Sequence, residues 1–415
     1  MKNLSKFTVG LFLLSGIFIA CNTETEDPDP TPELAFVGSE NCQTCHSEKY
    51  TSWIGSGHPY KFSVISDGTA PEYPAEAINF QSTWLTGLGD GSHTWDDIAG
   101  VIGGYGWKAR FVGTDGHIIG TAGSSFSTGA GHNQINFFGG VNLGWVDYEK
   151  TNDAKLYNYG CFKCHTTGGT QDGTWLTGVD GLGSFTEGGI GCESCHGPGS
   201  IHADDPKTDN IDRVYEFAHL DNTSGGLTID GTVITPSESG DDINFLCGTC
   251  HNRGYTNLID SKGGFIKHHE QWDELVSGVH STLNCTDCHN PHKRTIWNGD
   301  GLVKNCTDCH STVATTNHST GATCVDCHMP YAAKSGTTIG DSGYEGDIRS
   351  HLMKIAVSGE SIFTADGSAV IDNGTDDPAL NVAFACLGCH NRSSTDNITD
   401  KTIEQALASA AAMHQ

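Results

Sequence analysis

The chain has 415 residues, of which 36% are hydrophobic and 17% are charged, and it contains 54 glycines. This composition excludes a disordered chain, a collagen and a coiled coil, and no apolar run beyond residue 20 suits a protein with several membrane spans. The 22 basic and 50 acidic residues give a net charge of −28, which excludes a nucleic-acid partner because a polyanion would be repelled.

Residues 1–21 are predicted to be a signal peptide of the lipoprotein type. Lys2 and Lys6 precede an apolar segment at residues 7–20, which is too short to span a bilayer. Residues 18–21 (FIAC) resemble a bacterial lipobox, in which Cys21 is acylated, although Phe stands where Leu is usual and ordinary secretion is the alternative. We therefore expect export and a lipid anchor in the outer membrane or at the cell surface, or otherwise a periplasmic protein.

Residues 22–35 alternate acidic residues with proline, which predicts an extended tether and not a packed segment. An acidic run directly after a lipidated cysteine resembles the surface-export signal of some bacterial lipoproteins.

The other 16 cysteines all belong to eight copies of the motif Cys-x-x-Cys-His. Two thiols three residues apart can each add to one vinyl group of a haem, and the adjacent histidine then reaches the iron from the same face. In chain order, motifs 1 to 8 are Cys42-Cys45-His46, Cys161-Cys164-His165, Cys192-Cys195-His196, Cys247-Cys250-His251, Cys285-Cys288-His289, Cys306-Cys309-His310, Cys324-Cys327-His328 and Cys386-Cys389-His390.

Neither disulfides, zinc nor chance accounts for this pattern of cysteines. Disulfides would not require a histidine after every pair, and zinc ribbons have no such histidine either. Coincidence predicts roughly 0.03 motifs in a chain with 17 Cys and 21 His. The sequence therefore predicts an octahaem c-type cytochrome, in which eight covalent haems form much of the core and the motif histidines are the proximal iron ligands.

The spacing of the motifs suggests three segments after the tether. Residues 36–160 hold motif 1 and a Gly-rich, β-containing insert, residues 161–300 hold motifs 2 to 5, and residues 301–415 hold motifs 6 to 8 and a C-terminal helix. The expected fold is mainly α, with extensive irregular loops and a few short β-hairpins, as in multihaem cytochromes c whose core is built around the haems.

Turn signals and periodicity place the regular elements. A Thr-Asp-Gly turn between residues 106–112 and 117–119 predicts a β-hairpin, and Asp-Gly between residues 227–229 and 232–234 predicts a smaller one. Helices are expected around the motifs, at residues 264–280, and at residues 400–413 with Asp400 as the cap.

The second axial ligand is expected to be histidine at most irons. Besides Met1 only Met329, Met353 and Met413 are present, whereas 13 histidines lie outside the motifs, so bis-His ligation and low potentials are expected. Position near a motif or on a helix selects eight candidate distal ligands: His58, His202, His268, His269, His280, His292, His318 and His351. His268 and His269 are neighbours, so only one of them can face a given haem.

The remaining histidines are weaker candidates. His219 ends an amphipathic stretch, where a packing role is as well supported as ligation. His93, His117, His132 and His414 lie in Gly-rich, hairpin or terminal contexts, which favour a solvated role. Because the candidates outnumber the irons, the count leaves open whether one iron lacks a protein ligand.

Several segments resemble the multihaem cytochrome superfamily that contains pentahaem nitrite reductase, octahaem hydroxylamine oxidoreductase and its tetrahaem electron carrier. They are residues 36–58 (FVGSENCQTCHSEKYTSWIGSGH), 191–202 (GCESCHGPGSIH), the HHEQW stretch leading to His280, 288–292 (CHNPH), 327–330 (CHMP) and 346–351 (GDIRSH). The resemblance implies closely stacked haem pairs and distal ligands supplied by neighbouring motifs, here His58, His202, His280, His292, His318 and His351. No motif has the CxxCK form of pentahaem nitrite reductase.

Three functions compete. The favoured one is a low-potential electron-transfer protein of the bacterial envelope, whose negative charge suits redox partners with basic docking patches. The alternative is an oxidoreductase for nitrite, hydroxylamine, tetrathionate or sulfite at one open haem, with Arg110, Lys108 or a spare histidine nearby. In the third, a cytochrome filament, the next subunit supplies a distal histidine, which a retained lipid anchor disfavours.

Overall fold

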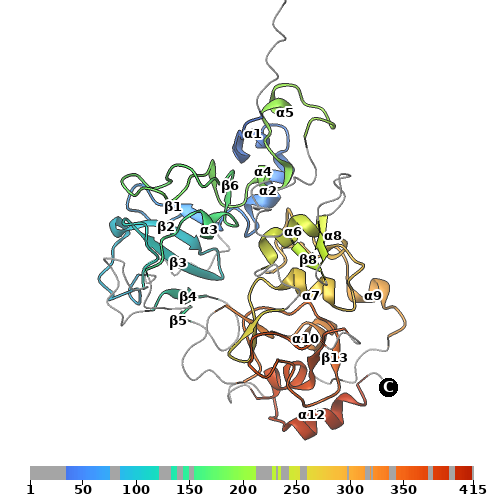
Figure 1. Ribbon diagram of the computed structural model, residues 1–415. Helices are drawn as coiled ribbons and strands as arrows, with labels where there is room; N and C mark the ends of the chain where they lie inside the picture. The colour runs from blue at the N-terminus through green and yellow to red at the C-terminus, as the bar shows by residue number, and fades with distance from the viewer. Residues whose placement is uncertain are drawn as a thin grey trace, which may run out of the picture. The chain divides into compact units, whose positions relative to one another are not determined.

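The structure is a computed structural model (Figure 1). Contacts within the chain divide it into two units, Met1–Leu34 and Ala35–Gln415. The described residues are 34–74, 85–120, 132–137, 144–148, 154–211, 227–229, 232–234, 243–252, 259–296, 299–313, 318, 321–335, 343–372, 377–391 and 398–413. The predicted signal peptide with Cys21, nearly all of the predicted tether, His219 and His414 lie outside them.

The largest regular element is an antiparallel sheet in the insert between motifs 1 and 2, coloured blue to teal in Figure 1. Its five strands follow each other in chain order: β1 (Phe62–Val64), β2 (Ile98–Gly103), β3 (Lys108–Gly113), β4 (Gln134–Asn136) and β5 (Gly144–Val146). Val101 and Phe111 face each other in register and are fully buried. They pack with Leu88 and Ile119 in one core cluster.

The hairpin predicted at residues 106–119 is present as a short one, in which the end of β3 pairs antiparallel with residues 117–119. Gly113 N–H donates to the carbonyl of His117 at 2.9 Å, and Val112 bridges Ile118. The main partner of β3 is β2. Four of the six residues of β2 are buried, so its sequence IAGVIG is apolar throughout and does not alternate with polar residues. A strand of this kind cannot be recognised from alternating hydrophobicity.

The remaining strands are short. Their bounds are β6 (Thr166–Thr167), β7 (Glu187–Gly188), β8 (Leu227–Ile229), β9 (Thr232–Ile234), β10 (Ser261–Lys262), β11 (Phe265–Lys267), β12 (Ala333–Lys334), β13 (Ile355–Ala356) and β14 (Leu380–Asn381). β8 and β9 pair antiparallel, which confirms the smaller predicted hairpin.

The helices are also short, and each Cys-x-x-Cys-His motif includes at least part of one. The longer helices are α2 (Ser47–Ile54), α6 (Ile243–His251), α7 (Gln271–Ser277) and α12 (Ile403–Ala410). The others are α1 (Ser39–Gln43), η2 (Trp95–Asp97), α3 (Tyr159–Phe162), α4 (Cys192–His196), α5 (Ser200–Asp204), α8 (Cys285–Cys288), α9 (Cys306–Cys309), α10 (Cys324–His328), η4 (Ala383–Leu387) and α11 (Gly388–His390).

Motifs 5, 6 and 7 share a local reason for being helical. In each, the residue before the first cysteine is the N-cap, and the aspartate before the second cysteine completes a capping box. The aspartate accepts the N-cap backbone N–H at 2.8 Å in α8 and at 2.9 Å in α9 and α10. The three pairs are Asn284 with Asp287, Asn305 with Asp308, and Thr323 with Asp326.

Two helix predictions need correction. Residues 264–280 are not one helix, because β11 pairs with β10 and β12 and His269 has a φ of 87°, which helical backbone cannot adopt. Only α7 is helical there. Its Trp272 packs closely against Gly248 of α6, where an added Cβ would lie 2.5 Å from the indole ring. The cap of α12 is Thr402, whose capping box with Gln405 begins the helix two residues after Asp400.

A buried carboxylate joins the first described residues to the CHGPG loop after motif 3. Glu193 is 1% exposed and accepts the backbone N–H groups of Val37 (2.9 Å), Gly38 (2.7 Å) and Gly199 (2.7 Å). Glu187 accepts the N–H of Ser39 at 3.1 Å close by. Two acids therefore fix residues 37–39 beside α4.

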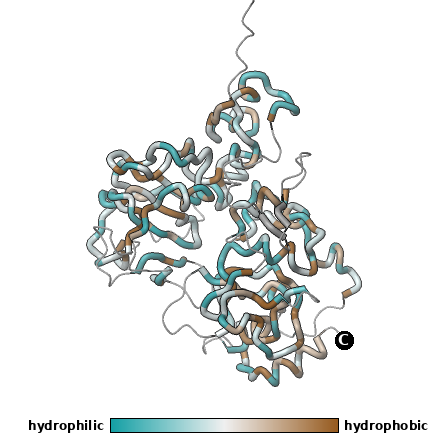
Figure 2. The backbone as a smooth tube through the Cα atoms, in the orientation of Figure 1, coloured by the Kyte–Doolittle hydropathy of each residue, from teal (hydrophilic) through white to brown (hydrophobic). Residues whose placement is uncertain are grey.

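In the part of the chain that Figure 2 colours, hydrophobic and hydrophilic residues alternate over short distances. Within the described residues, no helix is long and apolar enough to cross a membrane. In the same described part of the chain, the buried apolar side chains form four clusters. The space between the elements is accordingly occupied by a large cavity.

Candidate haem sites

A cavity of about 3400 Å³ runs through the unit Ala35–Gln415. Ordinary ligand pockets measure about 300–1,000 Å³, so this one is several times larger. Both cysteines and the histidine of motifs 1 to 7 line it, as do all eight candidate distal histidines. A chain that gathers its thiols and imidazoles around one such space has the donors and the volume that several covalently bound haems require.

Five motif histidines each face one of the predicted distal histidines across a gap of constant width. The distances between ring centroids are 6.2 Å for His46–His202, 6.3 Å for His196–His292, 6.2 Å for His289–His351, 5.9 Å for His310–His280 and 6.0 Å for His390–His318. Two imidazoles on opposite sides of one iron, with each nitrogen about 2 Å from the metal, place their centroids about 6.3 Å apart. The geometry therefore fits bis-His ligation.

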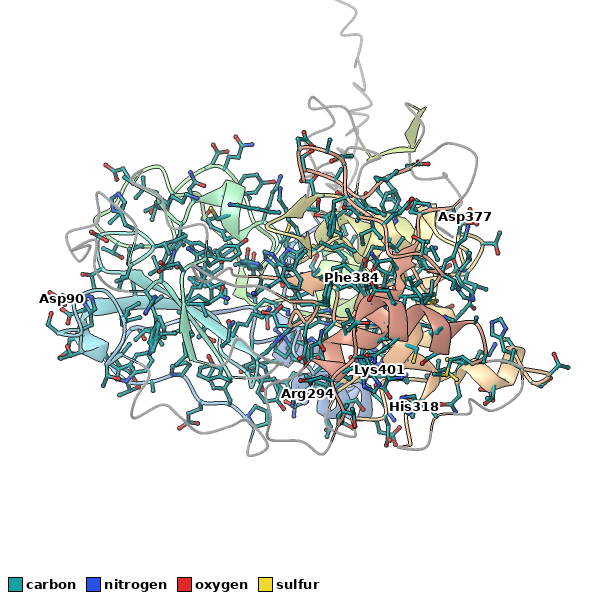
Figure 3. All side chains as sticks on the ribbon, turned by 90° about the horizontal axis from the view of Figure 1, so that it is seen from below. Asp90, Arg294, His318, Asp377, Phe384 and Lys401 are labelled. Carbon is teal, nitrogen blue, oxygen red and sulfur yellow. The ribbon has the colours of Figure 1, made fainter. Side chains whose placement is uncertain are left out.

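These pairings cross the sequence. His202 follows motif 3 but faces motif 1, and His292 follows motif 5 but faces motif 3. His318, labelled in Figure 3, precedes motif 7 but faces motif 8. Each of these candidate distal histidines therefore faces a motif other than the one beside it in the chain.

Hydrogen bonds orient several of these imidazoles. Nδ1 of His328 lies 2.8 Å from the carbonyl of Met353, and Nδ1 of His390 lies 2.7 Å from the carbonyl of Thr399. Nδ1 of His202 lies 3.0 Å from the carbonyl of Lys207. A ring whose Nδ1–H donates to a carbonyl presents Nε2 to the metal.

Burial favours the neutral form of four of these imidazoles, which is the form that metal ligation requires. It lowers the pKa of His58 and His165 to about 3 and that of His251 and His351 to about 4. Besides burial, the charges of Lys61, His251 and His292 lower the pKa of His58.

Two cations lie near the proximal histidine of motif 2. Besides burial, the charges of Lys61 and Arg110 lower the pKa of His165. Its Nδ1 lies 2.8 Å from the hydroxyl of Tyr157. The five facing imidazole pairs belong to motifs 1, 3, 5, 6 and 8, and the two cations make motif 2 the candidate for an iron open to an anionic substrate.

Polar groups converge near motif 2. Lys108 forms an ion pair with Asp347 at 3.2 Å, and burial lowers its pKa to about 8. The Arg110 guanidinium lies 4.6 Å from the ring centre of Tyr148, whose hydroxyl is 3.2 Å from Nε2 of His268. His268 and His269 lie with ring centres 4.1 Å apart.

Sequence reasoning identified Lys108 and Arg110 as possible substrate contacts but missed Lys61, Tyr148 and Tyr157. Burial lowers the pKa of Lys61, which lines the cavity three residues after His58. The sequence signal that could have identified Lys61 is a single lysine within the aromatic stretch HPYKF.

The histidines expected to be solvated lie in the insert beside aspartates. His132 Nδ1 is 3.1 Å from Asp147, and His117 Nδ1 is 3.5 Å from Asp115. His93 is 9% exposed, with Nε2 3.9 Å from Asp90. None of these three lines the haem cavity.

The cysteines of successive motifs approach one another. Side-chain hydrogen-bond contacts join motifs 1 and 3, 2 and 4, 4 and 5, and 6 and 7, through Cys42–Cys192, Cys164–Cys250, Cys247–Cys285 and Cys306–Cys324. Three more pairs of thiols lie within electrostatic range of each other and make motifs 3 and 4, 5 and 6, and 7 and 8 neighbours: Cys195 with Cys250, Cys288 with Cys309, and Cys327 with Cys386. All eight motifs are therefore connected, with motif 2 attached at motif 4.

Three acids at the start of α7 are buried beside the cavity. Glu270, Asp273 and Glu274 are 1%, 4% and 1% exposed. Glu274 accepts from the Ser350 hydroxyl at 2.6 Å and from the His351 N–H at 3.0 Å. Burial raises the pKa of all three, to about 7 for Glu274, and repulsion between Glu270 and Asp273 raises that of Glu270 further.

These acids predict a loss of stability with rising pH. Because the pKa of Glu274 is raised from 4.5 to about 7, its contribution is fully present below pH 4.5 and is lost as the pH rises through 7. The loss is on the order of 3 kcal/mol. The melting temperature is expected to fall between pH 5 and 8, with a flatter decline in Glu274→Gln and an unchanged one in the exposed control Glu360→Gln. A wild-type melting temperature that rises over this interval would contradict the prediction.

The comparisons with known proteins agree with the motifs. Residues 146–197, which hold motifs 2 and 3, match the family described as cytochrome c554 and c-prime. No curated protein matches the chain. The octaheme sulfite reductase MccA of Wolinella succinogenes, form II, is similar in structure with a TM-score of 0.54 and 16% identity, over 91% of this chain and 71% of that chain.

Two further structures are more distantly similar. The outer cell wall cytochrome OcwA has a TM-score of 0.46 and 18% identity, over 88% of this chain and 85% of that chain. The undecaheme cytochrome from the S-layer of Carboxydothermus ferrireducens has a TM-score of 0.34 and 20% identity, over 74% of this chain and 46% of that chain. The first of the three similarities is the one that supports a shared fold.

Proposed function

We propose that this chain, which has the fold of the multihaem c-type cytochromes, binds eight haems covalently and carries electrons through them. The observation that carries the proposal is the set of five facing imidazole pairs, with centroids 5.9 to 6.3 Å apart. Two histidines hold an iron at low potential and leave no position for a substrate, which suits electron transfer.

The path that we propose follows the sulfur contacts between motifs. It runs from motif 1 through motifs 3, 4 and 5 to motifs 6, 7 and 8, with motif 2 as a side branch at motif 4. Thioether sulfurs lie at the haem edge, so neighbouring sulfurs place neighbouring macrocycles edge to edge. Electrons would enter or leave at either end of this path.

The proposed location is outside the cytoplasmic membrane. Residues 1–21 have the features of an export signal, and an acylated Cys21 would anchor the chain to the outer membrane or the cell surface. With a net charge of −28, redox partners bearing basic patches would associate in a salt-sensitive manner.

A second candidate function is oxidoreduction of a small nitrogen or sulfur compound at the haem of motif 2. It is favoured by the surroundings of His165, where the cations Lys61 and Arg110 lie within electrostatic range of the imidazole. A local basic pocket would bind an oxyanion despite the acidic surface, and Lys108 is suited to proton delivery because its pKa is lowered to about 8.

Electron paramagnetic resonance of the oxidised, haem-quantified protein distinguishes the two functions. As a carrier, the protein is expected to show low-spin ferric signals that do not change with sulfite, nitrite or hydroxylamine. A high-spin signal equal to one haem that changes with one of these compounds would overturn the carrier proposal. Arg110→Gln should then weaken that change by at least tenfold, because one charge-assisted contact is lost.

A further inference from the structure

The proximal histidine of motif 2 has an unusual hydrogen-bond partner. Nδ1 of His328 and of His390 meets a backbone carbonyl, whereas Nδ1 of His165 meets the phenol oxygen of Tyr157 at 2.8 Å. The two ring planes differ by only 18°, with centroids 6.2 Å apart, so the hydroxyl points along the imidazole plane at Nδ1. Tyr157 lies eight residues before His165 in the chain, so a residue outside motif 2 contacts the histidine of that motif.

The Tyr157 ring is held rigidly. It is 1% exposed, its backbone N–H donates to the carbonyl of Gly116 at 2.9 Å, and its carbonyl accepts from the indole of Trp175 at 3.0 Å. Its ring packs on Phe62 with centroids 4.7 Å apart. The phenol oxygen therefore has little freedom to move away from His165.

The chemistry of the pair assigns the donor. When Nε2 of a neutral imidazole binds a metal, the proton is on Nδ1, so Nδ1–H donates and the Tyr157 oxygen accepts. Such a bond increases the electron donation of the imidazole and stabilises the more positive oxidation state of the metal. A side-chain acceptor also fixes the rotation of the ring more tightly than solvent would.

We propose that Tyr157 is a positioning residue that orients His165 and lowers the reduction potential of the motif 2 haem. The inference rests on the proposed haem at this motif. It implies that the reduction potential of the haem on the side branch is set separately from the potentials at motifs whose histidines bond to backbone carbonyls.

The test is Tyr157→Phe, which retains the ring and removes the acceptor. Spectroelectrochemical titration is expected to show one haem whose reduction equilibrium shifts about tenfold toward the ferrous form, equal to about 59 mV for one electron. The other haems should keep their potentials. Tyr60→Phe is the matched control, because its hydroxyl also lines the cavity but donates to the carbonyl of Ile54 at 2.8 Å, and it should shift no haem.

Peptide mass spectrometry separates the two levels of the inference. A wild-type peptide with Cys161 and Cys164 free of haem would refute the proposed haem at motif 2. A loaded motif whose potential is the same in Tyr157→Phe and wild type would refute the role of Tyr157. If Tyr157→Phe loads poorly, 3-fluorotyrosine at position 157 retains the shape with a weaker acceptor, and a shift in the same direction is expected; no shift would overturn the proposal.

Discussion

Replacing His351 by methionine is expected to raise the reduction potential of one haem, that of motif 5. His351 faces His289 at 6.2 Å, and a thioether ligand stabilises ferrous iron relative to an imidazole. Axial ligands shift haem potentials over about 0.8 V, so an increase of at least about 100 mV is expected. Spectroelectrochemistry with near-infrared magnetic circular dichroism would identify the His/Met haem and its potential.

The same replacement should slow electron transfer between the ends of the proposed path. Motif 5 contacts motif 4 on one side and motif 6 on the other, so an electron must pass it. A reduction potential 100 mV above that of the neighbouring haems corresponds to about 2.3 kcal/mol. Electrons would therefore be retained at motif 5. His132→Met, outside the cavity, is the control and should change neither potential nor rate. Unchanged potentials in His351→Met would exclude His351 as a ligand.

Replacing Glu193 by alanine is expected to cost about 3–5 kcal/mol of stability. Three backbone N–H groups lose their acceptor at a site that is 1% exposed, and water cannot replace it without opening the loop. Glu193→Gln retains one acceptor oxygen and should lose less. Chemical denaturation monitored by tryptophan fluorescence and haem absorbance measures both losses.

The effect of Glu193→Ala should also be local. Residues 37–39 connect to α1 and motif 1, and Glu193 lies within motif 3, so these two motifs are expected to lose haem first in peptide mass spectrometry. Glu48→Ala, on the exposed first turn of α2, should change stability by only a few tenths of a kcal/mol. Equal stability of Glu193→Ala and wild type would mean that the loop is held by other contacts.

The candidate ligands could be named from the sequence, but the motif that each candidate distal histidine faces could not. A Cys-x-x-Cys-His motif is local chemistry, and the prediction that bis-His ligation dominates follows from counting residues. Which imidazole meets which motif depends on tertiary structure, because His202 lies next to motif 3 and reaches motif 1. Sequence proximity alone therefore does not give the pairing.

The errors in secondary structure have the same origin. Residues 264–280 have helical periodicity, yet strand pairing of β11 with β12 and the left-handed backbone of His269 shorten the helix to α7. The surroundings of motif 2 were only partly predictable. Lys108 and Arg110 stand on β3 and were recognised, whereas Lys61 and Tyr157 reach the cavity through chain turns that carry no sequence pattern.

The capping boxes at motifs 5, 6 and 7 have a consequence for biosynthesis. Each box joins residues that are only three positions apart, so the turn can form in a nascent chain before any distant contact exists. Both thiols are then already on one helical turn when the attachment machinery meets them. Motif 3 has no such box, and its buried Glu193 needs partners from residues 37–38. Motifs 5, 6 and 7 can therefore form the helical turn on which haem is attached before the chain folds. Motif 3, in contrast, depends on the fold for its final conformation.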